Sequence, residues 1–186
     1  DECISLNGIL NYEFYNSAPS GNTVDNIPTT GADDTGEVSQ ININSFPGDA
    51  NTFSIRYTGN IKINEAGSYT FFTKSDDGSK LFIDGKEIVD NDGKHGQQQR
   101  SGSLNLTAGD HSIKILYFEN TGGQILEVSF ESTSLNIPNQ DIMNIVFASQ
   151  SDCFSLDTDN DGTSNRLDLD SDDDGCTDAN EYYNDI

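Results

Sequence analysis

Residues 152–186 form the most acidic segment of the chain, with twelve Asp and Glu side chains against one basic residue, Arg166. Two runs in this segment, thirteen positions apart, share one spacing: Asp at alternate positions, Gly at the sixth and an acid at the twelfth. In such a loop the first carboxylates converge on one cation, and the Gly permits the sharp turn. The spacing therefore predicts two calcium loops. Their expected oxygen donors are Asp157, Asp159, Asp161, Thr163 and Asp168 in the first, and Asp170, Asp172, Asp174, Cys176 and Glu181 in the second.

This acidic tail resembles thrombospondin type 3 repeats, in which calcium loops follow one another with little hydrophobic core. The sequence gives no sign of the flanking helices of paired EF-hands. A segment with a net charge of −11 (twelve acidic residues, one basic) repels itself and needs counter-ions to become compact. The resemblance implies a stalk or linker that calcium stiffens.

The chain has three cysteines, Cys3, Cys153 and Cys176, so one thiol is free or pairs outside this sequence. None stands in a CxxC motif, and we therefore expect neither a zinc nor a redox site. A structural disulfide fits an extracellular setting better. Cys153–Cys176 would clip the tail and contribute ~3 kcal/mol in the chain-entropy model. We favour this pair, with Cys3–Cys153 as the alternative.

Residues 1–150 are predicted to form one all-β domain, with residues 151–186 as a separate tail. Short runs of β-branched and aromatic residues recur between Gly, Asn and Asp turns, which indicates a sandwich or barrel. Apolar residues on both faces of 111–119 predict a central strand, and Asp84-Gly85 predicts a type I′ hairpin turn. The expected strands are 12–16, 52–58, 60–63, 68–75, 80–83, 86–89, 102–106, 111–119 and 125–131.

The overall charge limits the partners of the chain. With 32 acidic and 9 basic residues the formal net charge is −23, which makes nucleic acid and anionic membranes poor partners. No run of 18 apolar residues occurs, so we expect no transmembrane helix and no membrane insertion. The first residues carry neither a basic nor an apolar leader region, which is typical of a mature fragment or an excised piece.

The most informative part of the main domain is Asp76-Asp77-Gly78, at the end of a predicted strand. Taken alone, it is an ordinary turn, because neighbouring Asp side chains normally diverge and share one ion only with an unusual backbone such as a cis peptide. Three further motifs follow in order: Asn91-Asp92-Gly93-x-His95, Leu106-x-Ala108-Gly109-x-His111 and Tyr117-Phe118-Glu119-Asn120-x-Gly122-Gly123. Both histidines are expected to be structural, and Asp33-Asp34 to be a solvated turn.

This order of motifs resembles the PA-fourteen domain, the β-sandwich named from anthrax protective antigen, over roughly residues 5–148. The resemblance implies an antiparallel, jelly-roll-type β-sandwich, followed by the irregular tail wrapped around calcium ions. In the lectin members, two Asp residues joined by a cis peptide hold calcium together with an Asn and backbone carbonyls of a second loop. Two vicinal sugar hydroxyls complete the shell, as calcium accepts six to eight oxygens. The implied metal ligands are Asp76, Asp77, Asn120, Gly122 and Gln124, and the implied sugar-binding residues are Asp76, Asp77, Asn120 and Gln124, with Glu119 bordering the site.

These observations predict a calcium-dependent carbohydrate-binding module, of the lectin or adhesin kind, in a larger secreted or cell-surface protein. The expected partners are glycans, and the domain is expected to be a monomer within a multidomain chain. No nucleophile elbow occurs, and no acid/base couple stands out apart from the acids interpreted as ion ligands, so we do not expect an enzyme. Two alternatives remain: a structural spacer or protein-interaction domain with purely stabilising calcium, and a targeting module of a polysaccharide-degrading enzyme.

Overall fold

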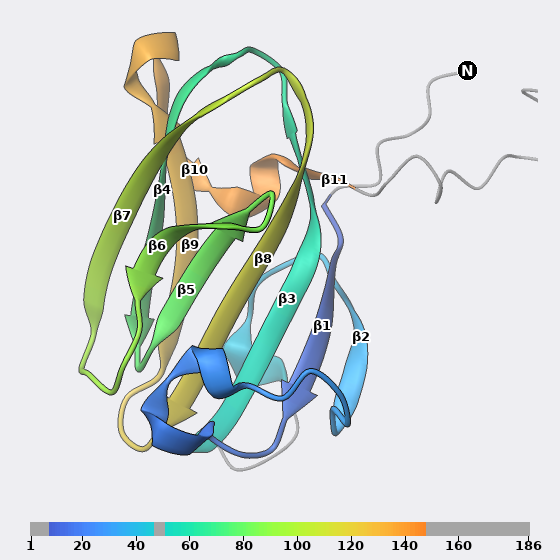
Figure 1. Ribbon diagram of the computed structural model, residues 1–186, viewed down its shortest axis with the longest axis vertical. Coiled ribbons are helices and arrows are strands. Elements are labelled where there is room, and N and C mark those ends of the chain that lie inside the picture. Colours follow the sequence, from blue (N-terminus) through green and yellow to red (C-terminus); the bar gives the residue numbers. More distant parts are fainter. Residues whose placement is uncertain (1–7, 47–50, 148–186) are drawn as a thin grey trace, which may run out of the picture. The chain divides into compact units, whose positions relative to one another are not determined.

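The computed structural model describes residues 8–46 and 51–147, and Figure 1 shows their strands in two layers. Short 3₁₀ helices occupy several connections: η1 Ser20–Asn22, η2 Val24–Asn26, η3 Ile43–Ser45, η4 Thr133–Leu135 and η5 Ile142–Asn144. The strands are β1 Leu10–Tyr15, β2 Asp34–Val38, β3 Thr52–Ile63, β4 Gly67–Asp76, β5 Ser79–Ile83, β6 Lys86–Asn91, β7 Gln98–Leu106, β8 Gly109–Asn120, β9 Ile125–Ser132, β10 Ile137–Asp141 and β11 Val146–Phe147.

The strands form a sandwich of two antiparallel sheets. One sheet has the order β2-β1-β3-β8-β5-β6, with β11 also paired to β3, and the other has the order β10-β9-β4-β7. The long strands β3 and β8 pair without interruption from Thr52 opposite Asn120 to Ile63 opposite Gly109. The predicted antiparallel β-sandwich is therefore confirmed. Among the described residues, no helix is long and apolar enough to cross a membrane.

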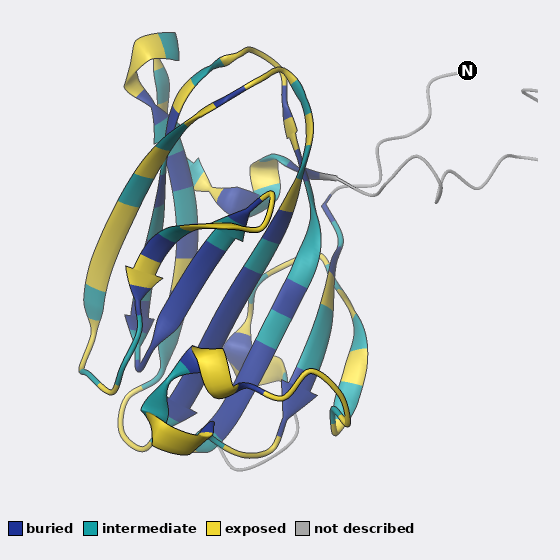
Figure 2. Ribbon diagram, in the orientation of Figure 1, coloured by how far each residue is buried: buried dark blue, intermediate teal, exposed yellow. Residues whose placement is uncertain are grey.

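The main core lies between the two sheets and follows the two-residue alternation of the strands. On β4, Tyr69 and Phe71 point inward and are buried, and on β9 Val128 and Phe130 do the same. Full burial of an apolar side chain of this size stabilises the fold by about 1.5–3 kcal/mol. Figure 2 shows that buried residues concentrate on β3, β5 and β8, in the middle of the larger sheet.

Strand β8 is buried on both faces, as its sequence predicts. Ile113, Ile115 and Tyr117 belong to the main core. On the opposite face Leu116 and Phe118 belong to a second, smaller cluster, which also contains three residues from β1 and the loop that follows it: Tyr15, Val24 and Ile27. The loop 16–33 thus covers the outer face of the larger sheet, although its polar composition does not predict this role.

Most predicted strands exist, and the differences have local causes. Residues 52–58 and 60–63 form one strand, because Gly59 stays in register opposite Ile113. The turn Asp84-Gly85 has positive φ at both residues, as a type I′ turn requires. Strands β2 and β10 were not predicted: their sequences are polar, and they form by pairing with β1 and β9. Asp34, expected in a solvated turn, begins β2 instead.

Three connections cross between the sheets at one end of the sandwich, the lower end in Figure 1. They are the turn 77–78 from β4 to β5, the loop 92–97 from β6 to β7 and the loop 121–124 from β8 to β9. Their common position follows from the register, in which Ser79 lies opposite Asn91, Ser75 opposite Gln98, and Asp76 opposite Ile125. We call this the crossing end.

Candidate functional site

Three carboxylates from two strands meet at the crossing end. Asp76 is the last residue of β4, Asp77 follows it in the turn, and Glu119 is the second-last residue of β8. One carboxylate oxygen from each lies within 4.8 Å of the other two. The peptide bond between Asp76 and Asp77 is cis. Asp77 and Glu119 are buried, with 2% and 0% of their surface exposed, whereas Asp76 is half-buried.

The Asp77 carboxylate is held by two backbone N–H groups from different loops. The His95 N–H donates to Oδ1 and the Asn120 N–H donates to Oδ2, both at 2.9 Å. The neighbouring Gly78 is tightly enclosed, because a Cβ there would lie 2.4 Å from Phe118 Cε1 and 2.9 Å from the Gly93 nitrogen. Asp77 therefore ties the β6–β7 and β8–β9 loops together, and only glycine fits after it.

Glu119 is buried beside two other acids, and few groups compensate its negative charge. The Tyr117 hydroxyl lies 2.6 Å from the Asp76 carbonyl oxygen and 3.3 Å from Glu119 Oε2, and its single proton favours the shorter bond. Glu119 Oε1 has no hydrogen-bond partner. Burial, followed by the charges of Asp77 and Asp76, raises the pKa of Glu119 to about 7. These features mark a place where negative charge is concentrated and uncompensated.

The β8–β9 loop contacts the cluster and two loops from earlier in the chain. Gly123 lies against Asp76, since a Cβ there would be 3.3 Å from Asp76 Oδ2. At one end of the loop the Asn120 side-chain amide donates to Asn22 Oδ1. At the other end Gln124 Nε2 donates to Asn44 Oδ1 at 2.6 Å, and Gln124 Oε1 is buried without a partner. Both loop amides thus use their NH₂ groups and keep their oxygens free of these contacts.

The structure brings several predicted site residues together. Asp76 and Asp77 share the cluster, and the backbone of Asn120 binds Asp77. Gly122, with φ of 124°, and Gln124 lie in the adjoining loop, and their roles as carbonyl ligands stay a prediction. Sequence reasoning missed His95 as a backbone donor and the two asparagines, Asn22 and Asn44. No local motif marks them, because their contacts span 18 to 98 residues of sequence.

This donor set suits a hard divalent cation. Carboxylate and amide oxygens are the ligands that calcium prefers, and an unpartnered buried carboxylate oxygen is costly without a cation. In the described ranges, every ion pair within 4.0 Å involves other acids, so no Lys or Arg neutralises the three carboxylates. The nearby Lys94 ammonium donates instead to the Thr121 hydroxyl, at 3.1 Å.

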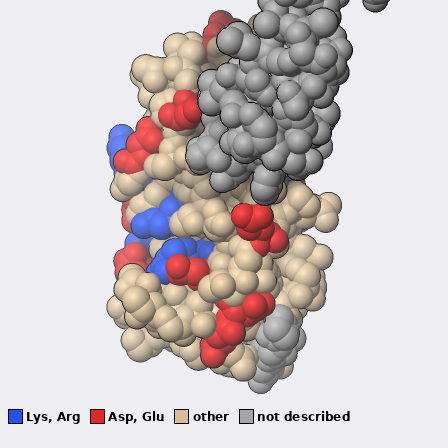
Figure 3. All heavy atoms as spheres, turned by 90° about the vertical axis from the view of Figure 1, so that its right-hand side faces the viewer, with Lys and Arg blue, Asp and Glu red and all other residues tan. Residues whose placement is uncertain are grey.

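Charged side chains lie in separate small groups on one face of the molecule. On the face shown in Figure 3, acidic side chains form several separate groups, and the few basic side chains lie beside some of them. The predicted tail loops from Asp157 to Glu181, the Cys153–Cys176 disulfide and the domain boundary at residue 150 lie outside the described residues.

The fold and the cluster together define a class of protein: a two-sheet antiparallel β-sandwich domain with a carboxylate cluster at one end, where connections cross between the sheets. Comparison with known families identifies the family within this class. The sequence profile of the PA14 domain matches residues 6–146, more than half of the chain. The chain belongs to the PA14 domain family, the PA-fourteen family that its motifs resemble.

Individual relatives are more distant. The chain is 30% identical over 84 residues to the anti-sigma-I factor RsgI3 of Acetivibrio thermocellus, which covers 45% of this chain and only 13% of that protein. The PA14 sugar-binding domain of an RTX adhesin superimposes with a TM-score of 0.61 at 22% identity, covering 76% of this chain and 99% of that one. The epithelial adhesin 6 A domain of Candida glabrata, solved with Galβ1-3GlcNAc, gives a TM-score of 0.57 at 12% identity, covering 78% and 88%. These structural likenesses establish the fold.

Proposed function

We propose that the chain is a calcium-dependent, non-catalytic carbohydrate-binding module of a larger secreted or cell-surface protein. The observation that carries this proposal is the cluster of Asp76, Asp77 and Glu119, with a buried carboxylate oxygen that lacks a partner. Three acids this close favour a bound cation, and their oxygens match the preference of calcium.

In this proposal each residue of the site has its own role, as the family resemblance implies. Asp76 and Asp77 hold the ion from the β4–β5 turn, and the Asn120 side-chain oxygen holds it from the β8–β9 loop, with backbone carbonyls at Gly122 and Gln124. Glu119, whose carboxylate lies within 4.8 Å of the other two, supplies a further negative charge. Bound calcium accepts more oxygens than these residues provide, which leaves positions for two vicinal sugar hydroxyls. Half-buried Asp76 is where a glycan would approach.

The comparisons support sugar as the ligand. One structural neighbour is named a sugar-binding domain of an adhesin, and another adhesin domain was solved with a disaccharide. Their sandwiches overlap most of the described part of this chain. Adhesion to glycan-coated surfaces is accordingly the first function that we propose. The tail loops from Asp157 to Glu181 are proposed as a second kind of calcium site, with the stiffening role of a stalk.

A glycan array probed with the whole chain, in calcium and in EDTA, tests the proposal. We expect binding in calcium, loss in EDTA, and loss in Asp76→Asn, because that substitution removes one of the clustered charges. Asp110→Asn changes the net charge equally on an exposed residue at the opposite end, and serves as the matched control. A calcium titration of Asp76→Asn should lose only the sandwich site and keep those of the tail.

Two results would contradict the proposal in different ways. Binding that survives EDTA or Asp76→Asn would place the glycan elsewhere on the molecule. Blank arrays at saturating calcium, together with an Asp76-dependent calcium site in the titration, would mean that the ion only stabilises the domain. The domain would then be a spacer or protein-interaction module.

The anti-sigma relative favours a second biological setting for the same site. It is 30% identical to this chain over 84 residues, although the match covers only 13% of that protein. In a protein of that kind, glycan binding would be sensed rather than used for attachment. The two settings predict different results. An adhesin retains cells on an immobilised glycan, whereas a sensor changes transcription when soluble glycan is added.

A further inference from the structure

Asn22 contacts a residue of the candidate calcium site, Asn120, from which it is distant in the sequence. It is the last residue of η1, in the loop 16–33, and adopts a left-handed backbone with φ of 53°. Its Oδ1 accepts a hydrogen bond from the side-chain NH₂ of Asn120, 98 residues away. An Asn side chain has one donor end and one acceptor end, so this contact decides which end of Asn120 remains for other partners.

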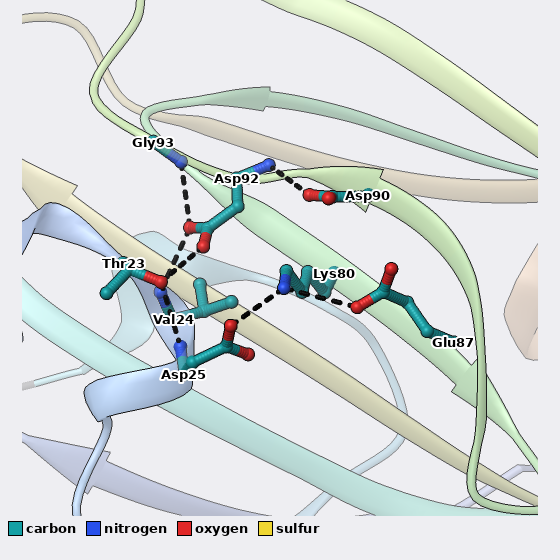
Figure 4. A network of polar contacts seen from close by, with 8 residues as sticks. All are labelled: Thr23, Val24, Asp25, Lys80, Glu87, Asp90, Asp92 and Gly93. Carbon is teal, nitrogen blue, oxygen red and sulfur yellow. Dashed lines mark hydrogen bonds and ion pairs between the residues drawn. The ribbon is translucent and has the colours of Figure 1, made fainter.

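The segment that carries Asn22 is fixed by the polar network in Figure 4. Asp92, at the start of the β6–β7 loop, accepts hydrogen bonds from the Thr23 hydroxyl and the Val24 N–H. Asp25 forms an ion pair at 2.9 Å with Lys80 of β5, whose ammonium also lies 3.1 Å from Glu87. Each of the three residues after Asn22 is therefore bound to the larger sheet or its loops.

Apolar contacts also hold this part of the loop 16–33 against the larger sheet. Val24 and Ile27 are 1% and 4% exposed, and they pack in one cluster with Leu116 and Phe118 on the outer face of β8. Phe118 is also the residue that closes over Gly78, next to Asp77. The loop 16–33 is thus packed on the same strand that ends at Glu119 and Asn120.

Together these contacts form a closed circuit of hydrogen bonds and backbone that passes through the Asp77 carboxylate. Asn22 binds Asn120, whose backbone binds Asp77 Oδ2. Asp77 Oδ1 accepts the N–H of His95, three residues after Asp92, and Asp92 holds Thr23, the neighbour of Asn22. A closed circuit of this kind fixes the orientation of each member more firmly than the separate contacts would.

We propose that Asn22 is a positioning residue of the sandwich calcium site. By accepting from the NH₂ group of Asn120, it leaves Asn120 Oδ1 as the oxygen that faces the ion, and the Asp92 network keeps it in place. The inference rests on the proposed function, since it assigns a role toward the same ion. It adds the loop 16–33 to the two loops that the sequence motifs identify.

The test compares Asn22→Gly with Asn22→Asp in the whole chain. Glycine tolerates the left-handed backbone but removes the acceptor, whereas aspartate keeps an acceptor oxygen that only the NH₂ end of Asn120 can satisfy. The sandwich calcium affinity is measured by calorimetry, as the difference from Asp76→Asn. We expect Asn22→Gly to weaken it about tenfold or more, about 1.4 kcal/mol, and Asn22→Asp to bind at least as tightly as the wild type.

Asn136→Gly is the matched control, because Asn136 is also left-handed, with φ of 56°, and lies at the opposite end of the sandwich after η4. It should leave calcium affinity unchanged. In EDTA, Asn22→Gly should still unfold in one cooperative thermal transition, as Asn136→Gly should, which separates positioning from folding. Unchanged affinity in Asn22→Gly, or equal loss in Asn22→Asp, would overturn the inference. A wild type without any Asp76-dependent site would refute the proposed function itself.

Discussion

Acidic residues lie at both ends of strands β5 and β8. The two ends differ in whether a basic group lies beside these acids. At the crossing end, Asp77 and Glu119 lie beside Asp76 with no basic side chain in ion-pair contact in the described ranges. At the other end, the β5–β6 turn places Asp84 Oδ2 2.6 Å from His111 Nδ1, and the Thr107 carbonyl lies 2.9 Å from His111 Nε2. Both ring nitrogens of His111 face acceptors.

The comparison separates a structural use of carboxylates from a ligand-binding one. Asp84 has its counter-charge built in, and the hydrogen bond from His111 lowers its pKa. Burial of Glu119 beside Asp77 and Asp76 does the opposite and raises its pKa to about 7. At one end of the sandwich an acid thus forms a self-contained pair with a histidine, whereas at the other end three acids form a cluster without a basic partner in the described ranges.

The largest expected effect comes from comparing two glycine-to-alanine variants, one at each end of the sandwich. Gly78→Ala would place its Cβ against Phe118 and the Gly93 backbone, so we expect a loss of about 1–3 kcal/mol and displacement of Asp77. Gly85→Ala meets no atom within 4 Å and only strains a φ of 75°, at about 1–2 kcal/mol. Calcium titration and urea unfolding check this: only Gly78→Ala should lose the sandwich site. Loss of calcium binding in both variants would break the distinction between the ends.

Glu119→Gln should have opposite effects with and without calcium. At about pH 8 in EDTA it removes a buried charge whose raised pKa disfavours the folded state, so the variant should be more stable than the wild type. In saturating calcium the wild type should recover or exceed this difference, because the ion compensates Glu119. Thermal melts under both conditions measure the crossover. A variant less stable in EDTA would show that Glu119 is already compensated without an ion.

The smallest effect concerns His111, through the pH dependence of stability in EDTA. Burial lowers its pKa, but the hydrogen bonds to Asp84 and Thr107 outweigh burial and raise the pKa above 6.5. A raised histidine pKa stabilises the fold fully below pH 6.5, and the contribution disappears as the pH rises through the folded value. His111→Gln should therefore cost up to about 1 kcal/mol near pH 6 and less near pH 9. A pH-independent difference in urea midpoints would mean that the His111–Asp84 pair is uncharged.

The sequence predicts the part of the fold that periodicity controls. Alternation identifies β9, apolar residues on both faces identify β8 as central, and Asp84-Gly85 identifies its hairpin. Strand β2 escapes prediction because Asp34–Val38 has no apolar run and is stabilised by its pairing with β1. The same limit applies to the site. The acid pair is a local motif and the family resemblance places Glu119 beside it, whereas the approach of Asn22 depends on loop packing.

The two hydrogen bonds that the Asp77 carboxylate accepts also have a kinetic consequence. Its two carboxylate oxygens hold the β6–β7 and β8–β9 loops before any ligand arrives. A segment that folds only on binding must first be ordered, which lowers affinity and slows association. Here the walls of the site are already assembled, so the rate at which a glycan is captured should depend on diffusion and on the occupancy of the ion, and not on loop closure.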